Sequence, residues 1–67
     1  MTTSDLLVEL RRSRTDLARL VEAAANPERA YVVVPAQAVR AWTEREPVAW
    51  AKVLEWLGAN GKALVQV

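Results

Sequence analysis

Prolines set where the regular elements of this 67-residue chain begin and end. Pro27 follows Asn26, and a residue before proline is driven out of the α conformation, so a helix from the N-terminal side must stop there. Pro35 and Pro47 each stand where a helix can start, because the first helical turn does not need the N–H that proline lacks. The chain is thereby divided into one N-terminal helix, a short connecting segment and two short helices.

Residues 4–25 are predicted to form a single long helix. Its apolar residues recur at helical spacing, while Ser13 interrupts the stripe, either as a close crossing point with another helix or as a polar gap. A helix of this length measures ~33 Å, which is longer than a compact domain of this size is wide. We therefore expect its stripe to pack against a second copy and form a homodimer. The predicted interface consists of Leu6, Leu10, Leu17 and Leu20.

Residues 30–34, Ala-Tyr-Val-Val-Val, are predicted to form a β-strand because they are rich in β-branched residues and too few for a stable helix. The strand has no polar alternation. It is therefore expected either to be buried on both faces, or to be buried on one face and covered by a partner on the other. Residues 62–67 alternate in the way of a half-buried closing strand.

Residues 35–45 and 47–57 are predicted to form the two short helices, which contain all three tryptophans. Trp50, Leu54 and Leu57 recur at core spacing, and Trp42 is expected to join them. Trp56 lies off that line, so it is either an interface anchor or a side chain packed beneath the first helix. Gly58 is expected at the left-handed position that ends the last helix, before a turn at Asn60-Gly61.

From Tyr31 to Val67 the expected order is strand, helix, tight turn, helix, glycine turn and strand. This order resembles that of winged helix-turn-helix domains. We therefore expect an α+β, mainly α fold: a single domain in which helix 4–25 precedes a winged-helix-like core, 30–67, with a two-stranded sheet. The resemblance implies a small DNA-binding transcriptional or mobile-element regulator that acts as a dimer on double-stranded DNA. Its contacts to DNA would come from Gln37, Arg40, Arg45, Lys52 and Lys62.

A second hypothesis is a non-catalytic protein-interaction or adaptor module that homodimerises through the long N-terminal helix and uses Trp56 as an anchor. The net charge of +1 gives no basic excess of the kind typical of small DNA-binding domains. Helix 47–57 also presents few of the side chains that read base edges.

Cysteine and histidine are both absent, which removes disulfides and the usual ligands of zinc, iron and copper. We therefore expect no cofactor, no metal and no enzymatic activity. The N-terminus lacks the pattern of a secretory signal, and no apolar run is long enough to span a bilayer. A cytoplasmic protein is expected.

Overall fold

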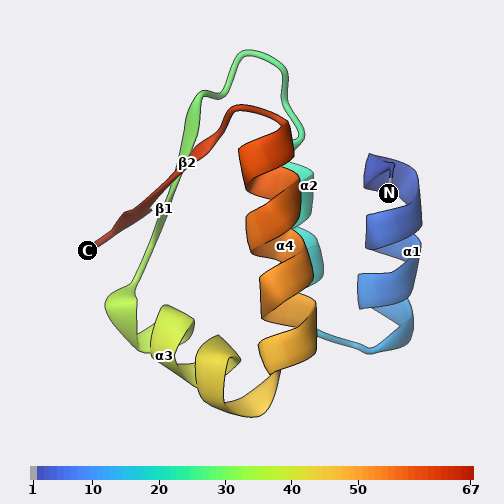
Figure 1. Ribbon diagram of the computed structural model, residues 1–67, viewed down its shortest axis with the longest axis vertical. Coiled ribbons are helices and arrows are strands. Elements are labelled where there is room, and N and C mark those ends of the chain that lie inside the picture. The colour runs from blue at the N-terminus through green and yellow to red at the C-terminus, as the bar shows by residue number, and fades with distance from the viewer. Residues whose placement is uncertain (1) are drawn as a thin grey trace.

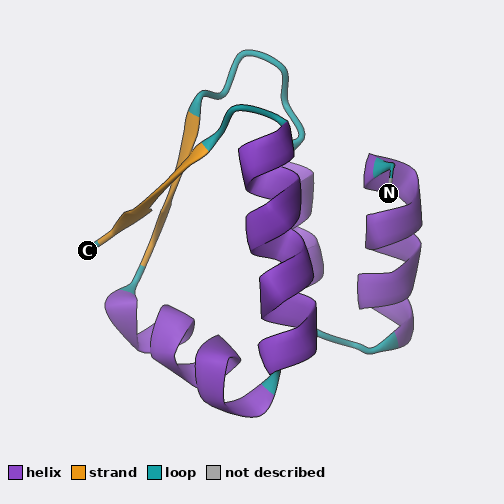
Figure 2. Cartoon of the chain, viewed as in Figure 1, coloured by secondary structure: helices purple, strands orange, loops and turns teal. Residues whose placement is uncertain are grey.

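The computed structural model describes residues 2–67, which form four helices and two strands (Figure 1; Figure 2). The fold class is α+β and mainly α, as predicted. In chain order the elements are α1 (Thr3–Arg12), α2 (Leu17–Ala24), β1 (Tyr31–Val34), α3 (Ala36–Arg45), α4 (Pro47–Ala59) and β2 (Ala63–Gln66).

The N-terminal helix is broken between α1 and α2, so the expectation of one helix over residues 4–25 is wrong. Ser13 is the C-cap of α1, and Arg14 follows with φ of 55°, in the left-handed region that ends a helix. The polar interruption at Ser13 was the visible sign of this break in the sequence.

Two hydrogen bonds define the turn. The amide of Thr15 donates to the carbonyl of Leu10 at 3.3 Å, and the amide of Arg14 donates to the carbonyl of Arg11 at 3.1 Å. Together they make a Schellman motif, which satisfies the last carbonyls of α1. The Thr15 hydroxyl then accepts a hydrogen bond from the amide of Leu17 at 3.3 Å and so caps the start of α2.

The break lets α1 fold back beside α2 and α4 (Figure 1). The domain measures 29 × 28 × 16 Å, so the 10-residue α1 does not overhang it. The leucines predicted to form a dimer interface are instead buried in the core of this one chain. Leu6, Leu10 and Leu17 are almost completely buried, and Leu20 reaches the surface only at one edge of the core. They cannot form an exposed stripe, so that predicted interface is wrong, while the homodimer itself stays a prediction.

The two strands pair in parallel, with Tyr31 opposite Ala63 and Val34 opposite Gln66. Helices α3 and α4 form the crossover that a parallel pair requires. One face of the sheet packs on α2 and α4, while α1 lies on the far side of these helices (Figure 1). Val32 and Val34 are buried on the inner face, and Leu64 is half-buried there.

Helix α4 turns a different stripe to the core than its sequence predicted. Trp50, Val53, Trp56 and Leu57 are buried, but the side chain of Leu54 is 41% exposed. Because Trp56 is buried beneath α1, the side of α4 that faces the core is the side that carries Val53. Leu54, about 100° around the helix from Val53, is therefore turned to the surface.

The end of α4 repeats the motif that ends α1. The amide of Lys62 donates to the carbonyl of Leu57 at 2.9 Å, and the amide of Gly61 donates to the carbonyl of Gly58 at 3.1 Å. Gly61 takes the left-handed conformation, with φ of 67°. The expectation that Gly58 would hold this position is wrong, because α4 continues to Ala59, two residues past its predicted end at Leu57.

Replacing Arg14 by glycine should raise the free energy of unfolding by about 0.5–1 kcal/mol, because glycine adopts a positive φ without steric cost. The matched change Arg12→Gly, at the last residue of α1, should lower it by up to about 1 kcal/mol. Urea denaturation of both variants checks this. A destabilised Arg14→Gly would mean that residue 14 lies within a continuous helix.

Leu57→Ala should cost about 2–5 kcal/mol because it opens a cavity in the core. Leu54→Ala, at an exposed site on the same helix, should change the stability by less than about 1 kcal/mol. Thermal melts of the two variants side by side test the orientation of α4, and equal losses would show that it is rotated from the position described.

Candidate interaction surface

The outer face of the sheet is apolar and uncovered. Tyr31 is 56% exposed and Val33 is 52% exposed on β1, while Val65 is 40% exposed on β2 and Val67 beyond it is 75% exposed. The outer face of β1–β2 consists of Tyr31, Val33, Ala63, Val65 and Val67. Parallel sheets are almost always covered on both faces. The expectation of full burial for β1 is therefore wrong, whereas the alternative, a face that a partner covers, stays a prediction.

The outer edge of β1 is also unprotected. The ladder to β2 begins with the amide of Ala63 donating to the carbonyl of Ala30 and ends with the amide of Val67 donating to the carbonyl of Val34, each at 3.0 Å. Backbone groups point to alternate sides along a parallel strand, so those of Tyr31 and Val33 point away from β2. Residues 31–34 include no charge and no proline, the devices that usually protect a free edge.

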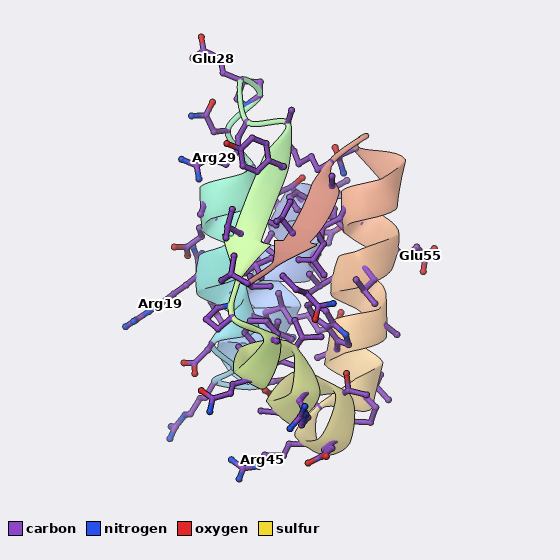
Figure 3. The ribbon with its side chains drawn as sticks, turned by 90° about the vertical axis from the view of Figure 1, so that its left-hand side faces the viewer. Arg19, Glu28, Arg29, Arg45 and Glu55 are labelled. Atoms are coloured by element: carbon purple, nitrogen blue, oxygen red, sulfur yellow. The ribbon has the colours of Figure 1, made fainter. Side chains whose placement is uncertain are left out.

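A groove runs along this edge between β1 and α2. One wall is the run Val32–Val34, and α2 contributes Leu20 and Ala23 to the other. Two residues of opposite charge, Asp16 and Arg29, also line it. Figure 3 views the sheet from its outer side and shows Arg29 beside the start of β1, on the side of α2.

Trp42 of α3 lines the groove and connects it to the core. The centroid of its ring lies 5.0 Å from the centroid of the Trp50 ring, and the two ring planes make an angle of 31°. Trp50 is buried and Trp42 is half-buried. The core role expected of both is therefore confirmed for Trp50, while Trp42 has one side in the groove. Aromatic pairs in contact contribute about 0.5–1.5 kcal/mol beyond the burial of their surface, so the pair joins the groove to the core.

The structure divides the five residues predicted to bind nucleic acid into two groups. Gln37, Arg40 and Arg45 are exposed on α3, and Arg45 points away from the body of the domain (Figure 3).

The two lysines are held within the chain instead. The ammonium group of Lys52 pairs with the carboxylate of Glu9 on α1. Lys62 donates to the carbonyl of Asn26 at 3.0 Å and to that of Arg29 at 2.7 Å, so it ties the start of β2 to the turn before β1. The structure thus does not bring the five together as one free basic surface.

Trp56 is part of the core and not an exposed anchor. Its side chain is buried, and its indole Nε1 donates to the hydroxyl of Thr3 at 3.0 Å. The expected interface role of Trp56 is wrong, and the other interpretation, packing beneath the first helix, is confirmed. This hydrogen bond joins α1 to α4 across 53 residues of sequence.

Sequence reasoning missed Asp16, Arg29 and the outer face of the sheet as parts of one surface. The uncharged run of β1 indicated an interior strand, and only the parallel pairing with β2 shows which residues face outward. Asp16 and Arg29 lie in two separate connections, so no spacing in the sequence relates them.

Among residues 2–67, no group of three or more acidic side chains comes together as a metal site. Over the same residues, no helix has both the length and the apolar character needed to cross a bilayer. No protein-family model, curated protein sequence or solved structure matches the chain.

Lys62→Met should lower the free energy of unfolding by about 1 kcal/mol, because the variant loses two charge-assisted hydrogen bonds to backbone carbonyls at a partly exposed site. Arg45→Met, which removes an exposed charge from α3, should leave stability unchanged. Chemical denaturation compares the two, and equal stabilities would show that Lys62 is free in solution.

Proposed function

We propose that this protein is a non-catalytic interaction module that binds another protein through the exposed side of its β1–β2 sheet. The observation that carries the proposal is the uncovered apolar outer face of a parallel sheet. A sheet with apolar residues on both faces gains stability when a second layer covers the bare face. We also propose that the protein works in the cytoplasm, since a chain without cysteine suits a reducing compartment.

The other exposed apolar side chains do not compete with this face. Val8 on α1, Val48 on α4 and Leu54 on α4 are exposed. These three side chains are divided between two helices, and singly scattered apolar residues are common on protein surfaces. On the sheet, by contrast, four such side chains lie on two paired strands and their ends.

Site-directed photo-crosslinking in cells tests the proposal. With Tyr31 replaced by p-benzoylphenylalanine, the full chain should form a crosslink to protein. With the same group at Val48, an exposed position on α4, it should not. Mass spectrometry then distinguishes a second copy from a different protein. Equal capture at both positions, or none at Tyr31, would contradict the proposal.

DNA binding is a second candidate function. The exposed side chains of Gln37 and Arg40 lie three residues apart on α3 and so share one side of the helix. With Arg45 they could contact a phosphate backbone. A crosslinker at Gln37 that captures duplex DNA, with an affinity that falls steeply as salt rises, would favour this function. Capture at Tyr31 alone would favour the protein-interaction module.

A further inference from the structure

We infer that the groove beside β1 takes an extended peptide segment of a partner protein, which adds to the sheet as a third strand antiparallel to β1. The inference rests on the proposed function and names the kind of partner. The segment carries a basic residue at the end near Asp16, an acidic residue at the end near Arg29, and two apolar side chains between them.

The backbone of β1 supplies the first element of recognition. Tyr31 and Val33 each direct an N–H and a C=O away from β2, toward the open edge. Addition of a strand to such an edge satisfies these groups with main-chain hydrogen bonds, and alternate side chains of the added strand then provide specificity. An antiparallel arrangement is the slightly more stable of the two.

The groove receives the side chains that point inward. In an antiparallel pairing, the peptide residues opposite Val32 and Val34 share the inner face with these two valines. There they meet Leu20 and Ala23 of α2 and the ring of Trp42, which all line the groove. This lining is apolar, so the two inward side chains of the peptide are apolar as well.

The charges set the direction of the peptide. Helix α2 runs in the opposite direction to β1 (Figure 1) and begins after Asp16, so Asp16 lies near the Val34 end of the groove. Arg29 lies near the Tyr31 end (Figure 3). Within residues 2–67 neither takes part in an ion pair, since the pairs are Arg11–Glu22 and Glu9–Lys52. An antiparallel strand therefore has its basic residue first and its acidic residue last.

A single strand fits this edge better than a second copy does. Helix α2 forms the inner wall of the groove, beneath the position of the added strand. In a symmetric dimer that pairs β1 with the β1 of a second copy, the two strands would lie ~4.8 Å apart. The α2 helices of both copies would then lie side by side beneath these two strands. Packed helices need an axial separation of about 8–10 Å, so the two α2 helices would collide.

The test uses the peptide acetyl-Lys-Thr-Val-Thr-Val-Thr-Glu-amide, whose charged and apolar residues alternate with threonine and so share the face turned to the groove. Its control has the Lys and Glu exchanged. Titration of the isotope-labelled full chain should shift the amide resonances of Tyr31 and Val33. The first peptide should bind about tenfold more tightly than its charge-exchanged control, because two surface ion pairs replace two repulsions. A double variant, Asp16→Arg with Arg29→Glu, should reverse this preference, and Arg45→Glu should not change it.

Equal binding of the two peptides, or shifts confined to α3 or α4, would overturn the inference, as would the absence of binding by either peptide. A crosslink from position 31 to a folded partner would then still support the proposed function. The absence of that crosslink would contradict the proposed function itself. The peptide titration and the crosslink therefore test the inference and the proposed function separately.

Discussion

The chain reverses its direction at Arg14, where a left-handed residue and the hydrogen bond from Thr15 to Leu10 end α1. Without this turn, the leucines of α1 would lie on a rod that extends past the domain. With it, Leu6 and Leu10 join Leu17 in one core, and α1 covers Trp56 of α4. A small domain without disulfides or metals depends on such a core for its stability. The rest of the fold is arranged around the helix pair that this turn creates.

The same turn decides which surfaces remain for partners. Since α1 lies on the side of α2 and α4 away from the sheet, nothing in residues 2–67 covers the outer face of β1–β2 (Figure 1). Two of the cations predicted to bind nucleic acid have other partners: Lys52 pairs with Glu9 of α1, and Lys62 binds the turn before β1. The surface that remains free for a partner is therefore the apolar face of the sheet and not a basic patch.

Local patterns predicted most of the elements and few of their contacts. Prolines and β-branched runs placed β1, α3 and α4 within two residues of their observed bounds, because these features act on the backbone nearby. The break in the first helix was harder to foresee. A non-glycine residue at positive φ has no sequence marker, and only Ser13 indicated it. Which side of α4 faces inward depended on that break. The interaction surface depended on the parallel register, which joins segments more than 30 residues apart.

The most direct test of this account is a nuclear Overhauser spectrum of the protein, read at the indole N–H of Trp56. If α1 folds back along α4, this proton shows cross-peaks to the side chain of Thr3, to which it donates a hydrogen bond at 3.0 Å. Sequential helical cross-peaks should also be interrupted at Arg14. An unbroken series of helical cross-peaks through residues 12–17, with none between Trp56 and Thr3, would contradict the fold and the surface derived from it.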